Sequence, residues 1–363
     1  MNQILTIIMI VGAIIGGVDR ILGNRLGYGA KFEEGFLFLG PTALSMAGMI
    51  CLTPILSKIL GTVVVPIYHW IGADPGMFGS FLAIDMGGFQ LARELAVDPH
   101  IGAYAGIVVS SIFGCTIVFT IPVGMGMIAK SDQRYFAKGI MIGLIAMPIA
   151  LTVGGLLCGL SVLECLHQNL PVFILALLLL LGLWHIPEHM IRGFYIFSGL
   201  IRFVVTIGLL LGVINHLCGF TLIKGIAPIT EAMSVVSSIG IVMLGSLPAA
   251  ECLQRILKRP FCLLGRRFCM NSTGMTGLLV GAVSVIPAIS MFKDMDERAK
   301  VANAAFLVSA ASLFAAHTGF TLSTQPEFLG ALIGAKISGG VVAFLLVHVI
   351  YTRKNKSHHA SNI

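Results

Sequence analysis

The feature that most constrains this chain is a succession of apolar runs, each close to the length that crosses a membrane as a helix. About 20 apolar residues are needed to span the hydrocarbon core of a bilayer. Short, charged connections separate the runs, so no part is left over for a soluble domain. The sequence therefore predicts an all-α, polytopic membrane protein, a single transmembrane domain over residues 1–363, with about eleven spans near residues 4–22, 35–56, 63–91, 101–128, 139–163, 171–186, 194–217, 232–253, 276–291, 301–320 and 328–351.

The composition supports this class of protein and excludes others. Hydrophobic residues make up 57% of the chain and charged residues only 11%, whereas a soluble domain carries about 25% charged residues. Folded in water, such a chain would expose large apolar patches, which excludes a cytosolic enzyme or a nucleic-acid binder. The formal net charge of +7 agrees with the Lys and Arg that membrane proteins keep in cytoplasmic loops. The expected surroundings are a lipid bilayer, with no nucleic-acid partner.

No metal, cofactor or catalytic site is indicated. The eight cysteines form no C-x-x-C pair, so they are expected to be small apolar fillers. The run His185-Ile186-Pro187-Glu188-His189 matches a zinc-peptidase pattern. That chemistry needs both histidines on one continuous helix, and Pro187 should begin a new helix instead. We therefore expect no metal, no cofactor and no enzyme.

Two parts of the chain resemble each other weakly. Pro122 precedes Asp132, and Pro287 precedes Asp296, with the matching residues 165 and 164 positions apart. Lys and Arg are also divided almost equally between alternate loops. Equal totals are expected when two halves of a transporter have opposite topologies.

These observations predict inverted structural repeats with broken or re-entrant segments. The expected halves are residues 1–165 and 166–325, with an extra C-terminal helix at 328–351. Five spans in each half would reverse the direction of the second copy. The loops at 130–138 and 293–300 should then lie on opposite sides of the membrane.

The stretch at 72–90 interrupts an otherwise apolar run with a proline and several glycines. Broken backbone survives at membrane depth only where protein or a water-filled cavity satisfies its polar groups. Asp85 lies in this stretch beside Gly87 and Gly88, and a carboxylate in such surroundings is a candidate functional group. The glycines would let a ligand approach the backbone closely. The alternative is a buried ion pair between Asp85 and a basic residue such as Arg93.

Three further positions are candidates. Glu34, with its neighbour Glu33, lies at the start of the second span, where the helix dipole alone favours carboxylates. The pair is therefore either structural or a vestibule that attracts cations. His317 lies among small residues and is either a hydrogen-bonded structural histidine or part of a proton relay. Ser284 precedes Pro287 in a stretch that we expect to break a helix.

At these segments the chain resembles the ethanolamine-utilisation permease family. The resemblance runs in order along nearly the whole chain, and Asp85-Met86-Gly87-Gly88-Phe89 is its most specific part. The chain departs from the family at Ala316, where the family has an acidic residue, and at Ser284-Val285, where it has asparagines. Other matching runs are Val18-Asp19-Arg20-Ile21-Leu22, Phe32-Glu33-Glu34-Gly35-Phe36, Glu94-Leu95-Ala96, Ile186-Pro187-Glu188 and the segment from Lys300-Val301 to Val308-Ser309-Ala310-Ala311.

The resemblance implies a multi-pass permease of the bacterial inner membrane that takes up ethanolamine by alternating access. Ethanolamine is an ammonium ion at neutral pH, so a carrier must offset the loss of its water. We expect Asp85 to supply the countercharge and Phe89 or Phe36 a cation–π face, which contributes about 0.5–2 kcal/mol. Gln90 or Ser284 could bond the hydroxyl. The complete expected set of substrate-binding residues is Asp85, Gly87, Gly88, Phe89, Gln90, Glu34, Phe36, Ser284 and His317.

Two other interpretations stay open. The first is a secondary transporter of another small amine, an amino acid or ammonium. The second, with less support, is an intramembrane enzyme, which lacks a plausible catalytic set. The departures at Ala316 and Ser284 allow a different substrate preference. A homodimer is the default expectation for the assembly.

Overall fold

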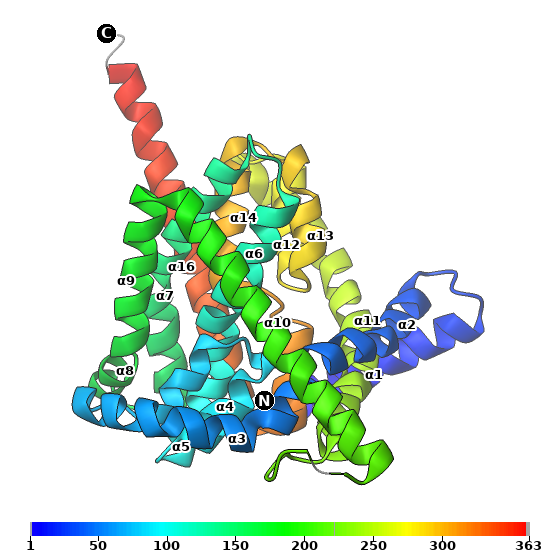
Figure 1. Cartoon of the computed structure of the whole chain (residues 1–363). Helices are drawn as coiled ribbons and strands as arrows, with labels where there is room; N and C mark the ends of the chain where they lie inside the picture. The colour runs from blue at the N-terminus through cyan, green and yellow to red at the C-terminus, as the bar shows by residue number, and fades with distance from the viewer. Residues whose placement is uncertain (1, 221, 361–363) are drawn as a thin grey trace.

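The computed structural model describes residues 2–220 and 222–360, and every regular element in these ranges is a helix (Figure 1). The first part of the chain forms α1 (Asn2–Ile21), α2 (Tyr28–Leu37), α3 (Leu39–Ile71), η1 (Pro75–Phe81), η2 (Ile84–Met86), α4 (Gly88–Leu95), α5 (Pro99–Tyr104), η3 (Ala105–Gly114), η4 (Thr116–Thr120), α6 (Ile121–Met127) and α7 (Gln133–Leu157). The second part forms α8 (Val162–Gln168), α9 (Leu170–His185), α10 (Pro187–Cys218), α11 (Ile229–Phe268), α12 (Ser272–Gly281), α13 (Val285–Ser290), η5 (Phe292–Asp294), α14 (Glu297–Ala310), α15 (Ala316–Thr324), η6 (Pro326–Phe328) and α16 (Leu329–Ala360).

Six helical stretches are long and apolar enough to cross a membrane, or seven if α8 and α9, which meet at 57°, count as one span. The six are Tyr28–Ile71, Pro99–Met127, Gln133–Leu157, Pro187–Cys218, Ile229–Leu263 and Pro326–Thr352. The structure thus confirms a multi-pass helical protein, but it does not show eleven spans. Within the predicted run 63–91, the α-helix ends at Ile71. The runs 276–291 and 301–320 are each divided between two short helices.

Three interruptions of helical structure meet inside the molecule. In the first, Gly72 ends α3 with a φ of 80°, and the 3₁₀ helices η1 and η2 follow. The second is the π-helical part of the chain, η3 and η4. The third follows α14, where Ser312 has a φ of 54° before α15 begins. Because η2 contacts η3 and α15, and η3 contacts α14, the three interruptions lie against one another.

The helices α7, α14 and α16 form the tightly packed part of the bundle. Each of them packs along the other two, and all three contact η3. Without a hydrophobic force to drive helices together in lipid, close packing of small side chains is what holds such an interface. Fully buried alanines supply it here: Ala146 and Ala150 on α7, Ala304 and Ala305 on α14, and Ala335 and Ala343 on α16.

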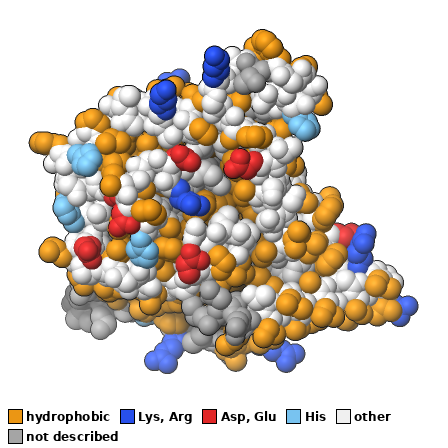
Figure 2. Space-filling view, turned by 90° about the horizontal axis from the view of Figure 1, so that it is seen from below, with side chains coloured by type: hydrophobic (Ala, Val, Ile, Leu, Met, Phe, Trp, Pro, Cys, Tyr) orange, Lys and Arg blue, Asp and Glu red, His pale blue; other side chains and the backbone are white. Residues whose placement is uncertain are grey.

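The helices α1, α2 and α11 form a second group that projects to one side of the bundle (Figure 1). Gly35 on α2 is required there, because a Cβ at this position would lie 2.6 Å from the main-chain oxygen of Met243 on α11. Seen from below in Figure 2, charged side chains and histidines gather over the main body, while apolar side chains cover much of the projecting part. α1 exposes Ile7, Ile10 and Ile14, as expected for a surface that faces lipid.

The prediction that the loops at 130–138 and 293–300 lie on opposite sides is wrong. Lys300 Nζ forms an ion pair with Asp132 Oδ1 at 2.8 Å, and Tyr135 donates a hydrogen bond to Glu297. The two matching segments therefore lie at the same end of the molecule, and α7 and α14 run from there side by side. These two matching segments therefore do not support an inverted arrangement of the two halves of the chain.

The helix break predicted at Pro187 is confirmed. α9 ends at His185, and Pro187 stands in the first turn of α10, where its missing N–H has no helical partner to lose. His185 bonds the main-chain oxygen of Leu181 through Nδ1. Among the described residues, no group of three or more His, Cys, Asp or Glu could hold a metal ion.

Candidate functional site

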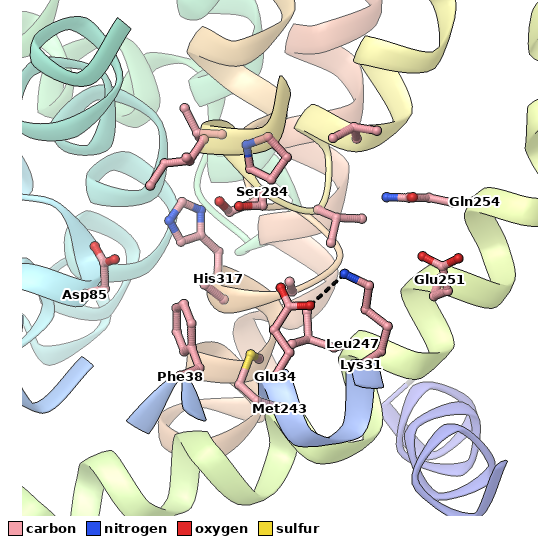
Figure 3. A pocket seen from close by; sticks show the side chains of 18 of the residues that line it. Lys31, Glu34, Phe38, Asp85, Met243, Leu247, Glu251, Gln254, Ser284 and His317 are labelled. Carbon is pink, nitrogen blue, oxygen red and sulfur yellow. Dashed lines mark hydrogen bonds and ion pairs between the residues drawn. The ribbon is translucent and has the colours of Figure 1, made fainter. Parts of the chain in front are cut away.

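A cavity of about 310 Å³ lies where the three interruptions face α2 and α11 (Figure 3). The hairpin between α12 and α13 forms part of its wall. Four of the nine predicted site residues line it: Glu34, Asp85, Ser284 and His317. They come from α2, η2, the start of α13 and the start of α15, so elements distant in the sequence bring them together. The volume is many times the roughly 30 Å³ of one water molecule, so a small amine fits with water around it.

Asp85 is held at the cavity by the turn that precedes α4. Gly87 adopts a φ of 92°, and a Cβ there would lie 1.9 Å from Cγ of Met49. Only glycine fits this turn without displacing α3. The Asp85 carboxylate forms no ion pair with any residue that the structure describes. Arg93 instead lies over the ring of Phe89, with 5.6 Å between its Cζ and the ring centroid.

His317 is the second polar group at this cavity. It lies in the first turn of α15, directly after the interruption, and its side chain is only 2% exposed. Its Nδ1 atom has no hydrogen-bond partner in the described structure. A buried imidazole nitrogen without a partner reduces stability. Figure 3 shows His317 between Asp85 and Ser284.

The mouth of the cavity carries charges of both signs. Lys31 Nζ pairs with Glu34 Oε2 at 2.6 Å, and the Glu34 side chain is 54% exposed. Glu251 on α11 also lines the cavity and pairs with Arg255 at 2.7 Å. Figure 3 shows the Lys31–Glu34 pair between His317 and Glu251. In this conformation, each of the two carboxylates thus pairs with a basic side chain of its own helix, α2 or α11.

The other predicted residues do not line the cavity. Phe36 is 60% exposed and does not line the cavity, whereas Phe38 does. Phe89 is buried against Phe320, with 5.5 Å between the ring centroids. Gln90 has a buried Oε1 without a hydrogen-bond partner in the described residues. Gly88 lies against the main-chain oxygens of the segment that leads into η2, so it shapes the turn.

Sequence reasoning missed Lys336. This side chain on α16 is fully buried, and its Nζ donates hydrogen bonds to main-chain oxygens of Ser111 at 2.9 Å, Ser309 at 3.2 Å and Ala311 at 2.9 Å. The available signal was its isolation, since no other Lys, Arg, Asp or Glu occurs between residues 328 and 351. An ionisable residue inside a membrane span is a functional candidate by default.

Comparisons with known proteins identify the family. The family model described as "Ethanolamine utilisation protein, EutH" matches residues 1–350. A probable ethanolamine permease EutH from Listeria monocytogenes is 42% identical over 360 residues, which cover 99% of this chain and 96% of the relative. A probable ethanolamine permease EutH from Escherichia coli is 38% identical over 381 residues, covering 94% of this chain and 93% of the relative.

A further relative is the uncharacterized protein YxeR of Bacillus subtilis, 38% identical over 344 residues, with 94% of this chain and 93% of the relative covered. No solved structure matches the chain. The family match includes every residue that lines the cavity, from Lys31 to His317. On this evidence, the chain belongs to the ethanolamine utilisation protein EutH family.

Proposed function

We propose that the protein is a permease of the bacterial cell membrane that carries ethanolamine and binds it as the ammonium ion. The observation that carries this proposal is the placement of Asp85. Its carboxylate, free of ion pairs in the described structure, faces a cavity of about 310 Å³ beside a broken helix. Relatives at 38–42% identity are named probable ethanolamine permeases, not enzymes.

The chemistry of the cavity suits the two ends of ethanolamine. An ammonium ion that leaves water needs a countercharge, which Asp85 supplies at close range. Phe38 and Phe119 line the same cavity and offer aromatic faces to a cation. The hydroxyl can bond the imidazole of His317 or the hydroxyl of Ser284, which both line the cavity.

The remaining predicted residues act in this proposal by shaping the site. Gly87 and Gly88 form the turn that presents Asp85, and Phe89 holds that turn against the bundle by packing on Phe320. Gln90 lies next to Phe89 on α4. Phe36 lies outside the cavity, so its predicted cation–π role passes to Phe38.

Alternating access would move α1, α2 and α11 relative to the bundle of α7, α14 and α16. The cavity lies between α2 and α11 on one side and the interruptions that contact the bundle on the other, and a rocking carrier binds its substrate at such a boundary. The ion pair between Glu34 and Lys31 at the mouth would break and re-form during this movement. The broken pairs α12–α13 and α14–α15 would cross the bilayer as discontinuous spans, a common plan in transporters.

Uptake by the purified protein in lipid vesicles tests the proposed function. We expect radiolabelled ethanolamine to enter vesicles that contain the protein and not vesicles without it. This uptake should persist in acidic medium, where little neutral amine remains to cross the bilayer unaided. Unlabelled ethanolamine should compete, and serine should not. Uptake that falls in step with the neutral amine would exclude the cation as the substrate. Equal competition by serine would indicate an amino-acid transporter instead.

A further inference from the structure

Lys336 is the charged group that the proposed function leaves unexplained. It is fully buried in α16, within a stretch apolar enough to span a membrane. Removing an ammonium ion from water costs several kcal/mol unless hydrogen bonds or an opposite charge replace its hydration. The described residues provide no ion pair for Lys336.

Main-chain oxygens replace the water that Lys336 loses. The ammonium has three N–H groups, and it donates to three carbonyl oxygens, those of Ser111, Ser309 and Ala311, at 2.9, 3.2 and 2.9 Å. These oxygens belong to two separate segments, η3 and the end of α14. We call this group of three oxygens the carbonyl cage.

Two of the three cage oxygens, those of Ser309 and Ala311, are available because the helix α14 is interrupted. The N–H groups of Ser312 and Phe314 leave the helical ladder and donate to Gly281 and Ala282 on the neighbouring hairpin, at 3.1 and 2.8 Å. The last carbonyls of α14 are therefore available, and the C-terminal end of a helix carries partial negative charge. Unwound carbonyls and half-helix C-terminal ends are the groups that bind coupling cations in broken-helix transporters.

We propose that the carbonyl cage is a monovalent-cation site and that Lys336 fills it with a tethered ammonium group. The N–O separations suit an ammonium or a K⁺ ion better than the smaller Na⁺ ion. Transport should accordingly proceed without a separate alkali ion bound at this place. The expectation about transport rests on the proposed function, whereas cation binding by the carbonyl cage does not depend on it.

The cage stands directly behind the substrate cavity. Ala311 supplies a cage oxygen, and the next residue, Ser312, lines the cavity together with His317. Ser111 supplies another oxygen, and Cys115, four residues later, also lines the cavity. The cation in the cage therefore joins the two chain segments that form this wall, and losing it should disorder the wall.

Replacing Lys336 by alanine tests the site without measuring transport. The variant Lys336→Ala vacates the cage, so K⁺ should bind there and stabilise the purified protein. We expect KCl to raise the thermal unfolding temperature of this variant by at least about 2 °C over the same concentration of N-methylglucamine chloride. Na⁺ should raise it less, and the unmodified protein should not respond. No specific rise with K⁺ would overturn the proposal.

Two control variants separate cage binding from a general effect of salt. Lys336→Met fills the same space without a charge, so it should be destabilised and K⁺ should not restore it. Lys58→Ala removes an exposed lysine of α3 and should behave as the unmodified protein. Equal stabilisation of all three variants by K⁺ would refute the cage. Bacterial cytoplasm is rich in K⁺, so failure to recover folded Lys336→Ala would also count against it.

Ethanolamine uptake by the unmodified protein tests the consequence for transport. Uptake into vesicles should be unchanged when Na⁺ and K⁺ are both replaced by N-methylglucamine. A loss of uptake that either alkali ion restores would overturn the inference while leaving the proposed function intact. If no ethanolamine enters under any condition, the proposed function fails, and the stability measurements still decide whether the cage binds a cation.

Discussion

At the residue scale, the site depends on polar groups whose partners are missing in the protein itself. Asp85 faces the cavity without an ion pair in the described residues, and His317 Nδ1 is buried without a hydrogen bond. Unpaired groups of this kind reduce stability. In the proposed function, the ammonium of ethanolamine would supply the partner that Asp85 lacks, and its hydroxyl would bond the imidazole of His317.

His317 should recognise the hydroxyl group and not the ammonium. The variant His317→Ala should therefore weaken ethanolamine binding by about two- to tenfold, the effect of one neutral hydrogen bond. Binding of ethylamine, which lacks the hydroxyl, should change little. Calorimetric titration of purified protein with both amines measures the difference. An equal loss for the two ligands would place His317 in a structural role.

At this scale, the sequence predicts which charged residue belongs to the site better than it predicts which neighbouring side chains line the cavity. Asp85 could be found because glycines surround it, but Lys336 was hidden because a single lysine does not interrupt an apolar run. Phe36 was chosen for its proximity to Glu34, yet Phe38 lines the cavity with Glu34. Residues four apart share a helix face better than residues two apart, and the helix ends at Leu37, so the neighbouring aromatic was the wrong choice.

At the scale of single elements, the part of the cavity wall that faces α2 and α11 is built where regular α-helix is interrupted. The turn at η2, the π-helical η3–η4 and the interruption after α14 expose main-chain groups, and they lie together so that protein and cavity satisfy them. The first break could be predicted from its glycines and proline. The third could not, because residues 311–315 contain neither glycine nor proline, and tertiary contacts with the α12–α13 hairpin impose the break.

The turn before α4 should be sensitive to a single methyl group. The variant Gly87→Ala adds both a left-handed backbone penalty and a clash with Met49, so it should destabilise the protein by about 2 kcal/mol or more. Thermal unfolding of the purified variant measures the loss. Wild-type stability of Gly87→Ala would contradict this turn geometry.

At the scale of the whole molecule, the helices form two groups, and the cavity lies where α2 and α11 of one group face the interruptions that contact the other. The multi-pass helical class and the family follow from the sequence, because apolar length and a long ordered resemblance are properties of the chain itself. The relative direction of the two matching segments, in contrast, does not follow from the sequence. Similar sequences indicate similar local structures, here a short helix, a loop with an acidic N-cap and a long helix, but not the direction in which the second copy runs.

Labelling of single cysteines should show the matching loops on the same side of the membrane. In a background without the native cysteines, Ser131→Cys and Lys293→Cys should react with an impermeant reagent from the same side, because Asp132 and Lys300 form an ion pair. Leu163→Cys, beyond the other end of α7, should react from the opposite side, since 25 helical residues extend about 37 Å. Opposite labelling of the two loops would contradict this arrangement.

The affinity of the purified Asp85→Asn variant for ethanolamine tests the central claim most directly. The substitution preserves size and hydrogen-bonding capacity but removes the countercharge, which should cost about 2–5 kcal/mol. At about 1.4 kcal/mol per tenfold change, binding should weaken more than about twentyfold. Glu188→Gln, which neutralises an exposed carboxylate on α10 away from the cavity, should bind normally. Near-normal affinity of monodisperse Asp85→Asn would exclude Asp85 as the ammonium site.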